Sequence, residues 1–81
     1  MRVRVRLFAS LREAVGASEV ELDLPDGATA ETAWQRLAEA HAALVPRRAR
    51  LTAAVNRRYA PFATPLHDGD EVVFVPPVSG G

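Results

Sequence analysis

The chain has 81 residues, including ten arginines, ten acidic residues and no lysine, so its formal net charge is zero. Its length and 48% hydrophobic share predict one folded domain rather than a disordered chain. The absence of cysteine excludes a disulfide framework and a cysteine nucleophile, and it fits a reducing compartment. Balanced charge argues against nucleic acid, and no apolar run reaches the length of a membrane span, so we expect a soluble, unprocessed, cytoplasmic protein.

The first quarter of the chain alternates with the period of half-buried strands. Residues 2–7 alternate arginine with valine or leucine, and residues 19–24 alternate acidic residues with valine or leucine. Residues 8–16 break this period and predict one or two helical turns that end at Gly16. The arginines would face the acids across the resulting hairpin.

A helix is predicted after the turn at residues 25–27. Thr29 is a suitable N-cap, and apolar residues then recur at helical spacing as far as Leu44. Trp34 lies in this stripe and is expected in the core. Pro46 is expected to end the helix.

The last third of the chain predicts short strands separated by turns. Residues 51–55 form the third strand, and residues 59–62 form a brief edge strand. Residues 71–75 are nearly all apolar and predict a central strand, with Phe74 in the core. Turns are expected at residues 56–58 and 67–70.

This order of elements predicts an α+β fold. A right-handed crossover from the second strand lays the helix on one sheet face. We therefore expect a β-grasp (ubiquitin-like) roll, with a mixed sheet of about four or five strands and one main helix. The predicted domain spans residues 1–75, and residues 76–81 form a flexible C-terminal tail.

Several polar residues suggest chemistry but have simpler explanations. His41 and His67 lack companion ligands at a recognisable metal-binding spacing. The carboxylates of residues 68–70 flank a turn glycine, which Asx-turn hydrogen bonding explains. The basic residues at 47–50 lack interleaved aromatics and predict a solvated loop.

Four segments together resemble a known family. They are residues 5–13 (VRLFASLRE), 53–56 (AAVN), 68–72 (DGDEV) and 75–81 (VPPVSGG). The chain resembles, over nearly its whole length, the small sulfur-carrier subunits of molybdopterin synthase, within the MoaD/ThiS family of ubiquitin-like proteins. The tail Pro-Pro-Val-Ser-Gly-Gly is the most specific element.

The resemblance implies a reaction cycle carried by the C-terminus. An E1-like enzyme uses ATP to adenylate Gly81, and sulfur then replaces the adenylate to give a thiocarboxylate. The large synthase subunit, expected in a heterotetramer, takes up the tail and passes the sulfur to a pterin precursor during molybdenum cofactor biosynthesis. The chain would bind no cofactor or metal itself, and it would serve the synthase as a non-catalytic sulfur donor.

The expected site therefore centres on the Gly81 carboxylate. Glycines can thread a narrow channel, and the prolines before them project the tail away from the sheet. For Phe8, packing in the core explains the residue as well as contact with a partner does. For Arg12, a solvated surface position explains it as well as contact with a partner does. The residues expected to contact partners are Gly80, Ser79, Val78, Pro77, Pro76, Val75, Phe8, Tyr59 and Arg12.

Three other functions stay open on the sequence alone. A sister carrier for tRNA thiolation, thiamin thiazole or cysteine synthesis would share the fold and the Gly-Gly end. A protein modifier would join Gly81 to lysines of other proteins. A β-grasp interaction module would use no covalent chemistry.

Overall fold

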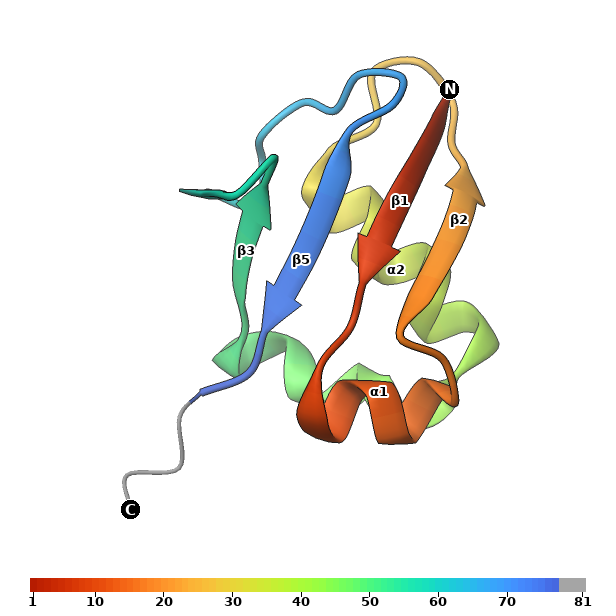
Figure 1. The fold of residues 1–81 in the computed structure, drawn as a ribbon, viewed down its shortest axis with the longest axis vertical. Coiled ribbons are helices and arrows are strands. Elements are labelled where there is room, and N and C mark those ends of the chain that lie inside the picture. The colour runs from red at the N-terminus through yellow and green to blue at the C-terminus, as the bar shows by residue number, and fades with distance from the viewer. Residues whose placement is uncertain (78–81) are drawn as a thin grey trace.

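A five-stranded mixed sheet forms the centre of the fold, in the strand order β2-β1-β5-β3-β4 (Figure 1). The computed structural model describes residues 1–77, and residues 78–81 lie outside the described part. The central pair β1 and β5 is parallel, and the other neighbouring pairs are antiparallel. The predicted β-grasp sheet and the central position of the last strand are confirmed. The strands are β1 (Arg2–Arg6), β2 (Glu19–Asp23), β3 (Thr52–Val55), β4 (Arg58–Ala60) and β5 (Glu71–Val75).

Helices cover one face and one end of the sheet. The main helix α2 (Ala30–Ala40) lies behind the sheet in Figure 1, and the short α1 (Ala9–Val15) lies at the end where β5 finishes. Thr29 caps α2 as predicted: its hydroxyl accepts from the Thr32 main-chain nitrogen, and the Thr32 hydroxyl accepts from Thr29. Among residues 1–77, no helix has the length and apolar character needed to cross a bilayer.

The main helix is shorter than the sequence predicts. It ends at Ala40, because His41 leaves helical geometry with φ −138° and ψ 86°. A 3₁₀ helix, η1 (Ala42–Arg50), follows and contains Pro46 instead of ending before it. Leu44 stays buried, so its apolar spacing is explained by a second helical segment and not by a longer α2. The basic residues at 47–50 belong to η1, so the prediction of a solvated loop is wrong.

The core lies between α2 and the inward face of the sheet. The ring of Phe74 meets Trp34 edge-on, with centroids 5.1 Å apart, and stacks on Phe62 at 5.8 Å. Phe74 and Trp34 are buried as predicted. The predicted edge strand is displaced: β4 ends at Ala60, so Phe62 lies beyond it and packs against the core. The largest of the fully buried side chains are Val3, Val5, Leu7, Leu11, Leu44, Val72 and Phe74.

Candidate functional site

The chain leaves the sheet from its central strand. β5 lies between β1 and β3 and hydrogen-bonds to both of them. Pro76, which is half-buried, and Pro77, which is exposed, follow directly and cannot donate to either neighbour. They leave at the end of the sheet where α1 lies (Figure 1). The predicted tail residues Val78, Ser79, Gly80 and Gly81 lie outside the described residues.

One row of residues crosses the sheet face that points away from α2. Val73 pairs with Arg6 on one side and with Ala54 on the other, and Ala54 pairs with Tyr59. Directly paired residues carry their side chains on the same face. Val72 and Phe74, which alternate with Val73, are buried on the inward face, so the Val73 row faces outward. Within residues 1–77 no helix covers this outward face (Figure 1).

Apolar side chains gather at the tail end of the outward face. Val75 lies two residues beyond Val73 on the same face, opposite Thr52 of β3. Phe8, the N-cap of α1, lies with its ring centre 5.7 Å from the Arg6 guanidinium carbon. Phe8 is 47% exposed, so the alternative of core packing for this residue is wrong. Tyr59 is 77% exposed. We name five residues the apolar patch: Phe8, Ala54, Tyr59, Val73 and Val75.

The patch unites three of the predicted contact residues and adds two that the sequence analysis missed. Val75, Phe8 and Tyr59 were expected at a partner surface, and all three belong to the patch. Val73 was overlooked because a nearly all-apolar strand predicts burial on both faces. Its half-buried state, beside Ala54 on an uncovered face, corrects that interpretation.

Arg12 has no place in the patch. It lies in the last turn of α1, where its carbonyl accepts a hydrogen bond from Gly16 at 2.8 Å. Its side chain is exposed and makes no salt bridge within residues 1–77. Gly16 has φ 85°, which confirms the predicted end of the first helical turns.

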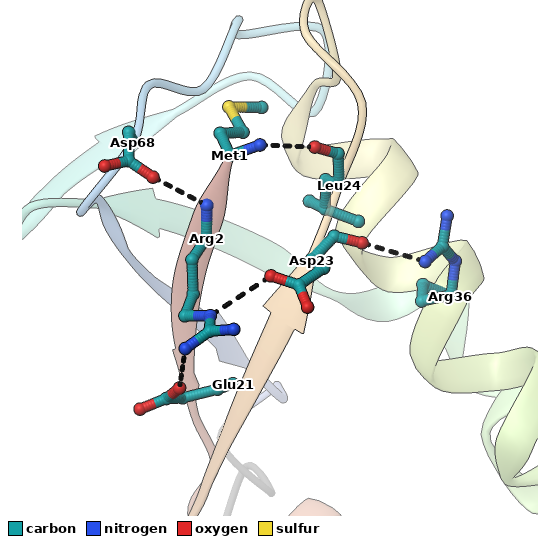
Figure 2. Close-up of polar contacts among 7 residues, drawn as sticks. All are labelled: Met1, Arg2, Glu21, Asp23, Leu24, Arg36 and Asp68. Carbon is teal, nitrogen blue, oxygen red and sulfur yellow. Dashed lines mark hydrogen bonds and ion pairs between the residues drawn. The ribbon is translucent and has the colours of Figure 1, made fainter.

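A polar network holds the opposite end of the sheet together (Figure 2). The Arg2 guanidinium donates to Asp23 at 3.1 Å and lies 3.5 Å from Glu21. The Arg2 main-chain nitrogen donates to Asp68 at 2.7 Å, which ties β1 to the turn before β5. The hydrogen bond and charge of Arg2 lower the pKa of the Asp23 carboxyl, and Asp23 in turn raises the pKa of Arg2. The network fixes the start of β5, while the candidate site lies at its far end.

The two turn carboxylates singled out from the sequence, Asp68 and Asp70, have structural partners. Asp70 accepts from the His67 main-chain nitrogen at 2.8 Å and from the Asn56 side chain at 2.9 Å. Asp70 therefore binds within the turn, whereas Asp68 accepts from Arg2 of β1. Both carboxylates have structural partners, but neither of these bonds has the predicted Asx-turn pattern. Residues 1–77 contain no cluster of three or more His, Asp or Glu side chains that could hold a metal ion. The described surface places the apolar patch close to the point where the chain leaves the sheet.

A β-grasp domain with these features has the architecture of a ubiquitin-like protein. The chain belongs to the ThiS family, whose model matches residues 5–81. It is 45% identical to the molybdopterin synthase sulfur carrier subunit of Escherichia coli (strain K12), over 98% of this chain and 99% of that one. It is 37% identical to the protein of the same name from Chlamydomonas reinhardtii, over the full length of both chains. The family resemblance predicted from the sequence is confirmed.

A solved structure agrees with the fold. The crystal structure of SAMP1 from Haloferax volcanii superposes with a TM-score of 0.90 at 31% identity, and the match covers 100% of both chains. The match extends the likeness from sequence motifs to the whole arrangement of strands and helices.

Proposed function

We propose that this chain is the sulfur carrier subunit of a molybdopterin synthase and carries sulfur as a thiocarboxylate on Gly81. One observation carries the proposal. Over 98% of its length, the chain is 45% identical to a protein of that name. We place the protein and its partners in the cytoplasm.

The chemistry of the carboxyl group explains why a partner must activate it. A terminal carboxyl has an ordinary pKa of about 3.3–3.7, so it is an anion near neutral pH and a poor electrophile. In the proposed cycle a carboxylate oxygen attacks the α-phosphorus of ATP, and pyrophosphate leaves. A sulfur nucleophile then attacks the carbonyl carbon, and AMP leaves with the former carboxyl oxygen. The resulting thiocarboxylate sulfur bonds to a carbon of the pterin precursor, from which an oxygen substituent leaves. Water then hydrolyses the thioester between carrier and pterin, which leaves the sulfur on the pterin and restores the Gly81 carboxylate.

The carrier contributes presentation and recognition to this cycle. We name residues 76–81 the arm. In the proposed cycle β5 anchors this arm, Pro76 and Pro77 direct it away from the sheet, and the two glycines suit a narrow channel in the partner. The apolar patch lies beside the arm and offers a docking face for the E1-like adenylating enzyme and for the large synthase subunit. We propose a heterotetramer with the large subunit, and ATP as the cosubstrate of the adenylating enzyme alone. We expect no cofactor on the carrier.

Intact-mass spectrometry tests the proposal directly. The carrier is incubated with the host's E1-like enzyme, ATP and a sulfur donor, and its mass should rise by the exchange of one oxygen for sulfur. The loaded carrier, mixed with the large subunit and pterin precursor, should yield molybdopterin and return to its original mass. An unchanged mass, under conditions that load the Escherichia coli carrier with its own enzyme, would contradict the proposal.

A truncated variant separates covalent chemistry from simple binding. Deletion of Gly81 should abolish loading, while the apolar patch and its affinity for the large subunit are retained. Loss of function on this deletion excludes a plain interaction module. Supplying tRNA, a thiazole precursor or a cysteine precursor in place of the pterin precursor would identify a sister pathway, because only the matching acceptor takes up the sulfur.

A protein-modifier function is the second candidate, favoured by the SAMP1 match. The same protein from Haloferax volcanii is described as small archaeal modifier protein 1, and its backbone superposes closely on this chain. If this chain modifies proteins, immunoblots of host extract should show higher-mass bands that disappear on deletion of Gly81. Free carrier alone would count against modification and leave the sulfur-carrier function in place.

A further inference from the structure

A cleft of about 430 Å³ opens beside the base of the arm. Ser10 of α1 lies on one wall, and Arg47 and Arg50 of η1 lie on another. Pro76 and Pro77, which follow β5, also line the cleft, together with Leu11, Pro46 and Leu51. The cleft is therefore built from three segments that are distant in the sequence, and it shares its rim with the exit point of the tail.

Arg47 and Arg50 make the described lining of this cleft positively charged. No acidic side chain lines it, and neither Arg47 nor Arg50 has a carboxylate within 4.0 Å among residues 1–77. Arg47 donates to the Ser10 carbonyl at 3.2 Å, which holds its side chain at the cleft. The neighbouring Arg48 differs, since its guanidinium is paired with Glu31. The two cleft arginines thus remain available for an anionic group from outside the described chain.

Continuity with the candidate site makes the cleft a contact surface for the same partner. Phe8 of the apolar patch caps α1, and Ser10 of the cleft lies two residues further along this helix. Pro76 follows directly after Val75 of the patch and lines the cleft. A protein that grips the arm at the prolines while covering the patch is brought next to Arg47 and Arg50.

We propose that the cleft docks an acidic segment of the enzyme that adenylates Gly81. This inference rests on the proposed sulfur-carrier function and names the partner's chemistry at that site. Guanidinium groups bind carboxylates through paired, charge-assisted hydrogen bonds, and the proline walls suit the apolar part of a peptide. Charge complementarity mainly accelerates encounter. That property suits an activating enzyme, which must bind and release the carrier in every cycle.

Charge reversal at the cleft tests this assignment. Arg47→Glu and Arg50→Glu are each compared with Arg36→Glu, which has the same change in charge on the outer surface of α2. Arg36 is a close match for Arg47, because each guanidinium donates to one main-chain carbonyl, that of Asp23 or that of Ser10. With the host's adenylating enzyme, each cleft variant should raise the KM for the carrier about tenfold with kcat retained. Arg36→Glu should remain within about twofold of wild type, because its charge lies outside the contact.

The binding kinetics add a second readout. The association rate of the wild type should fall as salt rises, and this dependence should weaken in both cleft variants. Thermal unfolding of all three variants checks that a raised KM reflects binding and not loss of the fold. If the enzyme adenylates both cleft variants with the same KM as Arg36→Glu, and the wild type is loaded normally, the cleft assignment is overturned and the proposed function is left intact. If the cleft variants lose affinity only for the large synthase subunit, the choice of partner is overturned. If the wild type is never adenylated, both proposals are overturned.

Discussion

The guanidinium carbon of Arg48 lies 3.4 Å from the centre of the Phe62 ring. The same guanidinium donates to the Glu31 carboxylate from both Nε and Nη2, with the shortest contact at 2.6 Å. One side chain of η1 therefore joins the first turn of α2 to the segment after β4. The guanidinium therefore makes charge-assisted hydrogen bonds to an anion and a cation–π contact with an aromatic ring at the same time.

Removing this side chain should destabilise the fold. Arg48→Ala loses the stacking on Phe62 and the paired bonds to Glu31, so we expect the free energy of unfolding to fall by about 1–3 kcal/mol. Arg48→Lys keeps the charge but not the planar guanidinium, so its free energy of unfolding should lie between those of the wild type and Arg48→Ala. Denaturant unfolding followed by the fluorescence of Trp34 measures both.

Arg50→Ala is the matched control for the Arg48 variants. Arg50 lies in the same helix, is exposed and forms no salt bridge within residues 1–77, so its loss should change stability by no more than about 0.5 kcal/mol. Equal effects of Arg48→Ala and Arg50→Ala would show that the Glu31–Arg48–Phe62 contacts add nothing to stability.

Phe74 should be among the most sensitive positions of the core. It is fully buried in the central strand and packs its ring against both Trp34 and Phe62. Phe74→Ala should lower the free energy of unfolding by about 3–5 kcal/mol, because a cavity opens between sheet and helix. Phe74→Leu should cost less, since most of the volume is kept. A loss below about 1 kcal/mol for the alanine variant in equilibrium unfolding would contradict this packing.

The strands were predictable because their burial is one-sided. Residues 2–7 and 19–24 alternate strictly, so the period of two is visible in the sequence, and the register Arg2↔Asp23 joins the two sets. The N-cap at Thr29 was also predictable, because a hydroxyl residue directly before an apolar helical stripe is recognised from a few neighbouring residues. These features depend on neighbours in the chain.

The end of α2 and the role of Arg48 depended on distant partners. Leu37 and Leu44 are both buried, but the spacing between them does not tell one continuous helix from an α-helix followed by a 3₁₀ helix. Arg48 resembles its neighbours in sequence, and only the approach of Glu31 and Phe62 distinguishes it. Val73 of the patch was missed for a similar reason, because no local pattern shows which sheet face lacks a helix.

Tyr59 should contribute to partner binding and little to stability. It is 77% exposed on β4, at the outer end of the Val73 row. Tyr59→Ser should weaken the affinity for the large synthase subunit by about 2 kcal/mol if the tyrosine is buried at the centre of that contact. Calorimetric titration with the purified large subunit provides the affinity, and thermal unfolding shows whether the domain is unchanged.

Val45→Ser offers the matched control for the patch. Val45 is 60% exposed but lies on η1, away from the outward sheet face. Its replacement removes a comparable exposed apolar group and should leave the affinity unchanged. If Val45→Ser weakened binding as much as Tyr59→Ser, the docking face would not be the patch.

The Arg2–Asp23 pair should give stability a dependence on acid pH. Arg2 lowers the pKa of Asp23 in the folded state, so folding favours the carboxylate. This contribution is present above the unfolded pKa of about 3.9 and is lost as the pH falls through the lower folded value. The stability difference between wild type and Asp23→Asn should therefore shrink below about pH 4. Denaturant unfolding at neutral and acid pH checks it, and a difference that grows in acid would reverse the assigned sign.

The two prolines should matter for activation more than for folding. Proline restricts φ, so replacing Pro76 and Pro77 by glycine widens the range of conformations that the free arm samples. Each substitution should add about 0.4–1 kcal/mol to the conformational free energy that is lost when a partner binds the arm. Together the two substitutions should lower kcat/KM for adenylation roughly 4- to 30-fold. Pro61→Gly, in the exposed segment after β4, is the control and should leave kcat/KM unchanged. Pyrophosphate release at limiting carrier concentration measures kcat/KM. Wild-type efficiency in the double glycine variant would mean that the partner alone orders the arm.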